Sequence, residues 1–373
     1  MTKNFQRPEN ATEQDVTDSE VAAALEQLQT GNVDRADKLL RDALVKDRDN
    51  IDALYLLGLV GCRTQHWVEA VELIGRAIEI DPRRIKYYGD LGVAQLALER
   101  FDDAMSSFQQ LLSHEPENAL ALFNMGRTFV LSGKRSEAIP LIEQAIKTQP
   151  KFLEARRALA SLLLDHGRAP DAVDQYKKII QQAPDDIEAI ANCGAAMTAA
   201  GRANEAVALL SEVSATQKDN PLVLGNLGLS LAAADRGEEA VSYLQEALEL
   251  EPENPRILNN FGNMLRKLGR LEEAEHHLSH ALALRDDYIE ARNNLALTYF
   301  DQERYEGAEI ELTQALAVAP NAPRILNNLG LVQQYTNRMD EAVESFSKAL
   351  ELEPSYLEAE TNLATVYSGI GNL

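Results

Sequence analysis

The sequence repeats itself at a fixed period of about 34 residues, and this period restricts the possible folds more than any other feature. An alanine returns at this interval in an unbroken register: Ala36, Ala70, Ala104, Ala138, Ala172, Ala206, Ala240, Ala274, Ala308 and Ala342. Prolines follow the same interval or its double, at Pro82, Pro116, Pro150, Pro184, Pro252, Pro320 and Pro354. This is the length of a helix–turn–helix unit, so the sequence predicts a tandem array of helix pairs.

Each unit is expected to contain two helices, as residues 255–286 illustrate. The first half places apolar and small residues at helical spacing, at Leu258, Phe261, Gly262 and Leu265. Gly269 is expected to end this helix, and Ala274, Leu278 and Ala281 form one face of the second helix. Small residues let the paired helices approach closely. Because helices of about 12–15 residues are marginal alone, stability must come from stacking of neighbouring units.

This pattern resembles the tetratricopeptide repeat (TPR) family over residues 17–373. The repeats begin at residues 17, 51, 85, 119, 153, 187, 221, 255, 289 and 323, and a partial repeat covers residues 357–373. The resemblance implies an all-α fold, a right-handed α-solenoid superhelix whose first helices line the concave face. Residues 1–16 are polar and contain Pro8, so we expect them to form a disordered segment.

The overall charge restricts the partners. The chain has 36 basic and 59 acidic residues, a formal net charge of −23. Such a surface repels phosphate backbones, so nucleic acid is excluded as an expected partner. The amino-terminal residues contain no apolar run of the secretory type, and no stretch has the length needed to span a bilayer. We therefore expect a cytoplasmic protein without direct membrane insertion.

Asparagine recurs at the sixth position of the predicted first helices, a position that the resemblance places in the groove. These residues are Asn124, Asn192, Asn226, Asn260, Asn294, Asn328 and Asn362. Arg127, Arg256 and Arg324 fall on the same predicted face. An amide both donates and accepts hydrogen bonds, so a row of amides can bind the backbone of an extended peptide. The alternative is that these asparagines link neighbouring helices or are simply solvated.

The amino-terminal repeats differ from this polar row. Their groove positions include an apolar set: Tyr55, Leu59, Val93, Leu96, Phe123, Val130 and Leu131. We expect either apolar anchors for a partner segment or ordinary packing between adjacent first helices.

No set of residues predicts catalysis or a cofactor. His276, His277 and His280 lie close together in one predicted second helix, and His276 and His280 have a spacing that suits a metal. No further ligand completes a recognisable motif, so we interpret them as surface histidines without a metal. Cys193 replaces a core leucine and is expected to be a small buried hydrophobic residue.

The sequence thus predicts a non-enzymatic scaffold that binds extended protein segments, by analogy in a bacterial assembly such as pilus or secretion machinery. The alternative is the non-catalytic, substrate-presenting arm of a larger glycosyltransferase or sulfotransferase. This alternative rests on the eleventh repeat, which stops at Leu373 before its second helix. We therefore expect the natural chain to continue, and self-association through the carboxyl-terminal helix is a further possibility.

Overall fold

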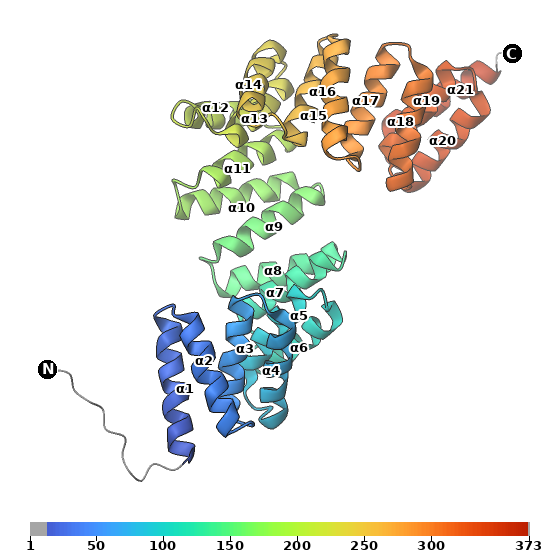
Figure 1. Cartoon of the computed structure of the whole chain (residues 1–373). Coiled ribbons are helices and arrows are strands. Elements are labelled where there is room, and N and C mark those ends of the chain that lie inside the picture. Colours follow the sequence, from blue (N-terminus) through green and yellow to red (C-terminus); the bar gives the residue numbers. More distant parts are fainter. Residues whose placement is uncertain (1–12, 372–373) are drawn as a thin grey trace. The chain divides into compact units, whose positions relative to one another are not determined.

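Residues 13–371 are described by the computed structural model, and every regular element among them is a helix (Figure 1). The described chain divides into two units, Met1–Gly167 and Arg168–Leu373. The division falls inside the predicted repeat 153–186. Of the predicted disordered segment, residues 1–12 lie outside the described residues, and the chain is already helical from Glu13.

The first unit contains α1 (Glu13–Gln29), α2 (Val33–Lys46), α3 (Ile51–Arg63), α4 (Trp67–Ile80), α5 (Ile85–Ala97), α6 (Phe101–His114), α7 (Ala119–Leu131), α8 (Arg135–Thr148) and α9 (Leu153–Asp165). The second unit contains α10 (Ala169–Gln182), α11 (Ile187–Ala199), α12 (Ala203–Ser214), α13 (Pro221–Ala233), α14 (Gly237–Leu250), α15 (Pro255–Lys267), α16 (Leu271–Leu284), α17 (Ile289–Asp301), α18 (Tyr305–Val318), α19 (Pro323–Tyr335), α20 (Met339–Leu352) and α21 (Leu357–Gly371).

The odd-numbered helices from α3 onward begin at the residues predicted as repeat starts, which confirms the register of the period. Several starts are fixed by a side chain that accepts hydrogen bonds from the free N–H groups of the first turn. These capping residues are Asn50, Asn118, Asp186, Asn220 and Asn254. The period therefore repeats a helix-start signal as well as an apolar pattern.

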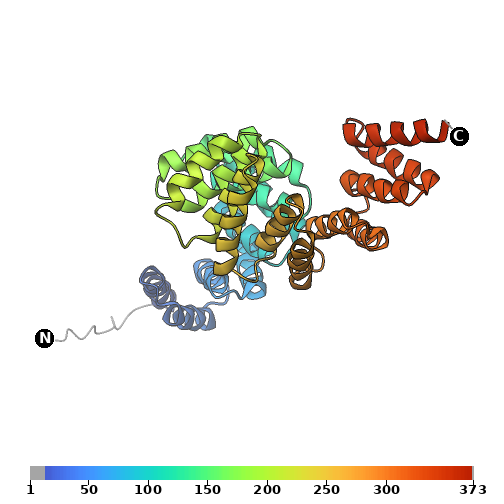
Figure 2. The same cartoon turned by 90° about the horizontal axis from the view of Figure 1, so that it is seen from above.

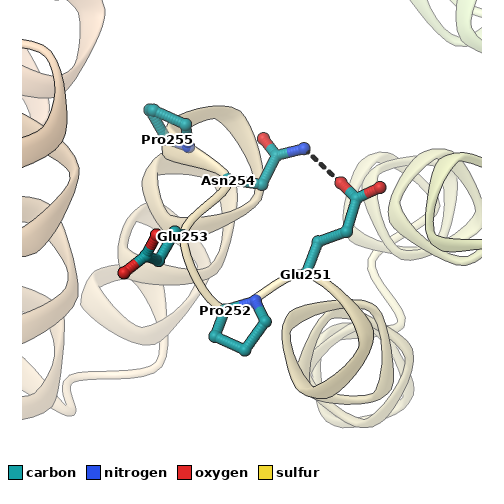
Figure 3. A pocket seen from close by; sticks show the side chains of 5 residues that line it. All are labelled: Glu251, Pro252, Glu253, Asn254 and Pro255. Carbon is teal, nitrogen blue, oxygen red and sulfur yellow. Dashed lines mark hydrogen bonds between the residues drawn. The ribbon is translucent and has the colours of Figure 1, made fainter.

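The turn between α14 and α15 shows how one repeat is joined to the next (Figure 3). Asn254 Oδ1 accepts hydrogen bonds from the backbone N–H groups of Arg256 and Ile257, at 3.0 and 3.3 Å. Asn254 Nδ2 donates to Glu251 Oε2 at 2.6 Å, and Figure 3 shows Glu253 on the other side of the turn. Pro255 starts α15, where its missing N–H costs no helical hydrogen bond.

The turn inside each repeat requires a left-handed backbone. As predicted, Gly269 follows the first helix, and its φ is 76°. The same position recurs once per repeat, with glycine at Gly31, Gly133, Gly167 and Gly201. Other repeats place larger residues there at positive φ: Gln65, Glu99, Asp235, Glu303 and Asn337. These larger residues carry a conformational cost that glycine avoids.

A close contact joins the two helices of a repeat. A Cβ atom placed on Gly92 of α5 would lie 2.7–2.9 Å from three ring carbons of Phe108 in α6. The same relation, between a glycine of the first helix and a large side chain of the second, recurs in other repeats: Gly58 with Ile74, Gly126 with Ile142, Gly194 with Leu210, Gly228 with Leu244, Gly262 with Leu278 and Gly330 with Phe346. The predicted role of the small residue is confirmed.

Within each unit the helix pairs stack in sequence order, and Figure 2 shows the same succession from above. In the second unit, one apolar cluster passes from repeat to repeat through Leu210, Leu227, Leu244, Phe261 and Leu278. Within each unit, the paired helices therefore contact each other and the next repeat. This is the stacking of an α-solenoid, as the sequence predicted.

Replacement of Gly92 by Ala is expected to reduce the free energy of unfolding by about 1–3 kcal/mol, because the added methyl collides with the fully buried Phe108 ring. The control is Gly75→Ala in α4, where a Cβ meets no atom within 4 Å. It should stabilise the chain by about 0.5–1 kcal/mol. Urea unfolding of both variants checks this, and shifts of the same sign would contradict it.

Replacement of Glu99 by Gly should stabilise the protein by about 1 kcal/mol, because glycine adopts the φ of 57° at this turn without strain. Gly133→Ala, at the equivalent turn with a φ of 81°, should destabilise it by a similar amount. Thermal and urea unfolding of both variants provide the measurement. A lower stability of the Glu99→Gly variant would refute the prediction.

Candidate functional site

Most of the predicted row of asparagines is less accessible than the sequence suggested. Asn124, Asn226, Asn294 and Asn328 are buried, with exposed fractions between 1% and 8%. Asn192, Asn260 and Asn362 are half-buried. A buried amide must be hydrogen-bonded to avoid a desolvation cost, so the partners of these side chains decide their role.

In the second unit the asparagines bond one another across neighbouring first helices. Asn294 Nδ2 of α17 donates to Asn259 Oδ1 of α15 at 2.8 Å. The same bond recurs one repeat later, from Asn328 of α19 to Asn293 of α17 at 2.7 Å. It recurs again from Asn362 of α21 to Asn327 of α19 at 2.9 Å. The asparagines therefore link neighbouring helices, which was the alternative that the sequence left open.

The row therefore contains two asparagines in each of the three repeats that begin at residues 255, 289 and 323. The second one is the fifth residue of the first helix, which the sequence pattern places on the polar part of the groove but does not link to the next repeat. We call Asn259, Asn260, Asn293, Asn294, Asn327, Asn328 and Asn362 the asparagine row. The signal was available, because the Asn-Asn pairs at 259, 293 and 327 recur at the repeat period.

Several amide atoms in these links have no partner among the described residues, although Asn259 Nδ2 donates to Asn260 Oδ1 at 3.3 Å. Among residues 13–371, no hydrogen-bonding partner is present for Nδ2 of Asn293 and Asn327 or for Oδ1 of Asn294 and Asn328. None of these atoms is completely enclosed by protein. The links therefore fix the orientation of the amides. Among the described residues, the Asn293–Asn328 link leaves one donor, Asn293 Nδ2, and one acceptor, Asn328 Oδ1, without a protein partner.

The remaining predicted residues of the second unit have separate surroundings. Asn226 Nδ2 of α13 donates to the backbone oxygen of Ala191 in α11 at 2.9 Å. Its Oδ1 accepts from Arg256 Nη1 of α15 at 3.2 Å, although Arg256 is an exposed residue. Arg324 is exposed. Asn226 thus forms the same kind of link as the asparagine row, with a backbone acceptor.

Asn124 and Arg127 belong to the first unit, where they contact each other. Arg127 Nη1 donates to Asn124 Oδ1 at 3.4 Å, and both residues lie on α7. The structure does not place them with the asparagine row of the second unit.

The predicted apolar set divides into core and surface. Leu96 and Phe123 are buried in the first unit, so they belong to the core and are not available as anchors. Tyr55, Leu59 and Val93 are half-buried, whereas Leu131 is 58% exposed. Leu96 and Phe123 therefore follow the packing alternative that the sequence left open.

A tyrosine–aspartate arrangement connects α3 and α5. The rings of Tyr55 and Tyr87 stack with centroids 3.6 Å apart and planes 8° from parallel. Tyr55 Oη donates to Asp90 Oδ2 at 2.7 Å, and Tyr87 Oη donates to Asp52 Oδ1 at 3.1 Å. Burial raises the pKa of Tyr87 to about 12, so this hydroxyl remains a donor at neutral pH. Each helix thus supplies one tyrosine and one carboxylate.

The three histidines of α16 lie near one another, with the rings of His276 and His277 5.2 Å apart. Among residues 13–371, no group of three or more His, Cys, Asp or Glu side chains is arranged to hold a metal ion. His277 is half-buried against Phe261, with ring centroids 4.8 Å apart. Burial and the nearby His276 lower the pKa of His277. The expected burial of Cys193 is confirmed.

Helices α1 to α21 include no segment with the length and apolar content required to cross a membrane.

The family models, a relative and a solved structure that resemble this chain all carry the same kind of repeat. Family models described as tetratricopeptide repeat match residues 21–85, 90–133, 123–187, 163–227, 219–287, 253–321 and 323–356. A TPR repeat-containing protein of Bacillus subtilis, YpiA, is 26% identical over 125 residues, which are 34% of this chain and 30% of that protein. The crystal structure of a thermophilic TPR protein from Thermus thermophilus is 26% identical, with a TM-score of 0.40. The alignment covers 48% of this chain and 98% of that one.

The lowered pKa of His277 predicts a pH-dependent stability. Above the ordinary pKa of about 6.5 the ring is neutral in both states and makes no contribution. At lower pH the unfolded histidine takes up a proton while the folded one resists it, so the free energy of unfolding falls. The His277→Leu variant should therefore lose less stability than the wild type between about pH 7 and about pH 5. Urea unfolding at several pH values tests this, and parallel pH profiles would contradict it.

Proposed function

Because the chain belongs to the tetratricopeptide repeat family, whose members are typically non-catalytic protein-interaction scaffolds, we propose that its asparagine row binds the backbone of an extended peptide. The observation that carries this proposal is the recurring link between Asn259 and Asn294, Asn293 and Asn328, and Asn327 and Asn362.

The free atoms of the row match a peptide backbone. The row presents the amide N–H donors of Asn293 and Asn327 and the amide oxygen acceptors of Asn294 and Asn328. A peptide residue offers the complementary carbonyl and N–H groups. Neighbouring packed helices are about 8–10 Å apart, and an extended chain advances about 3.3 Å per residue. One link would therefore serve about three residues of the bound peptide. The side chains between these contacts stay free, so binding tolerates varied sequences.

The links also reduce the cost of binding. A free asparagine side chain must lose rotational freedom when it binds a ligand. Here each amide is already held by a neighbouring helix, at 2.7–2.9 Å in the three recurring bonds. Preorganised groups bind with a smaller entropic cost. The same bond therefore serves helix packing and ligand recognition.

The test removes the free donors while keeping the helix links. The double variant Asn293→Asp and Asn327→Asp replaces the free Nδ2 atoms by oxygen, and the remaining oxygen of each residue still accepts the link. Selection of random peptides displayed on phage, followed by titration of the best peptide, should show at least about tenfold weaker binding to this variant. A second measurement passes a cell extract over the immobilised chain and identifies the bound proteins by mass spectrometry. Pilus or secretion components among them would support the predicted assembly.

The matched control is the double variant Asn321→Asp and Asn337→Asp, which changes the net charge equally at two turn residues outside the row. It should bind the selected peptide as the wild type does. Equal affinity of the wild type and the Asn293/Asn327 variant, with both folded, would overturn the proposal. So would an equal loss in the control, because the effect would then be one of total charge.

A further inference from the structure

A small cavity opens in the first unit where α5 has no side chain at its fifth position. The equivalent residues of the neighbouring first helices are Tyr55 and Phe123, whereas α5 carries Gly89. The cavity has a volume of 210 Å³ and lies between α5, α6 and α7. This is enough for a single long side chain. The cavity therefore lies at a position of the first helices that the sequence places in the groove.

The floor of the cavity is apolar and its wall carries a carboxylate. Val93, Phe108 and Leu111 contribute apolar surface, and Phe108 and Leu111 are buried core residues. Asp90 and Glu115 also line the space. An apolar floor beside an acidic group suits a ligand that is apolar along its length and charged at its end.

Asp90 has no cationic partner among the described residues. Its Oδ2 accepts a hydrogen bond from Tyr55 Oη at 2.7 Å. In the described part of the chain, no lysine, arginine or histidine nitrogen lies within 4.0 Å of its carboxylate, although Lys86 is one helical turn away and also lines the cavity. Burial raises the pKa of Asp90, and the hydrogen bond from Tyr55 offsets this rise only in part. A half-buried carboxylate of this kind gains from an external cation.

We propose that this cavity receives one lysine or arginine side chain of a partner protein, with its methylene stem on Phe108 and Leu111 and its cationic end on Asp90. Lysine and arginine bury their stems along apolar surface while the charged end finds a polar partner. The site lies in the first unit and uses none of the asparagine row, so it goes beyond the peptide-backbone binding proposed above.

Other side chains fit less well. An aliphatic side chain would fill the floor but would cover Asp90 without neutralising it, which costs free energy. An acidic side chain would meet two carboxylates, Asp90 and Glu115, against the single ammonium of Lys86. The net charge of −23 also draws basic segments toward the protein. A basic side chain is therefore the occupant that packs on the apolar floor and also neutralises Asp90.

In the first step of the test, random peptides displayed on phage are selected separately for binding to the full-length wild-type chain and to the Gly89→Leu variant, whose added side chain fills the cavity. The wild type should enrich peptides that carry lysine or arginine at one fixed position, and Gly89→Leu should lose this enrichment. Gly75→Leu is the control, because a Cβ at Gly75 meets no atom within 4 Å. It should select the same peptides as the wild type.

The second step titrates one selected lysine peptide and its norleucine analogue, which keeps the stem and lacks the charge. Asp90→Asn preserves the acceptor for Tyr55 and should weaken binding of the lysine peptide by about ten- to one-hundredfold. The same variant should affect the norleucine peptide little. Asp103→Asn, an equal charge change at an exposed residue of α6, should leave both affinities unchanged.

The proposal is overturned if the cavity-dependent peptides carry an apolar or acidic residue at the selected position. It is also overturned if Asp90→Asn binds the lysine peptide as tightly as the wild type does. These outcomes are separate from failure of the asparagine row, which is read from the Asn293/Asn327 variant in the second unit. A peptide whose affinity falls in the Gly89 and Asp90 variants alone uses the cavity, and one whose affinity falls in the Asn293/Asn327 variant alone uses the asparagine row.

Discussion

The contact between a glycine of the first helix and a large side chain of the second determines how closely most of the repeats pack. A Cβ atom added at these glycines would lie 2.5–2.7 Å from the nearest side-chain atom, so no larger residue fits without movement of its neighbour. This proximity allows helices of about 12–15 residues, too short to be stable alone, to share a continuous core. Only side chains that are not used in packing within a repeat or against the next repeat can contact a partner.

Polar residues in such an array must satisfy packing before they can bind a ligand. Asn294 and Asn328 are 6% and 8% exposed, and their N–H groups are already used between helices. An amide has more hydrogen-bonding capacity than one link consumes. A residue can therefore stabilise the stack and still present an oriented atom, and structural and binding roles need not exclude each other in the asparagine row.

The period alone predicted the helix pairs, their starting residues, the turn at Gly269 and the close contact at Gly262, because these depend on residues near in sequence. It did not predict that Asn259 accepts from Asn294, since that bond joins two helices whose spacing depends on stacking. The sequence left Phe123 open between an apolar anchor and packing between first helices, and stacking makes it a core residue. The sequence did not predict the cavity at Gly89. The absence of a side chain there creates a space only because the equivalent positions of the neighbouring first helices carry Tyr55 and Phe123.

The two proposed sites recognise different parts of a partner. Amides that bind a backbone contribute affinity with little dependence on sequence, because every residue offers the same groups. A cavity whose carboxylate has a hydrogen-bond donor but no cationic partner among the described residues discriminates by side chain, because a wrong occupant leaves Asp90 without a cation. In a repeat array each unit contacts only its neighbours, so one repeat can change its surface without disturbing distant ones. Glycine at position 89, between two repeats with aromatic residues at the equivalent position, is such a local change and adds selectivity without altering the stack.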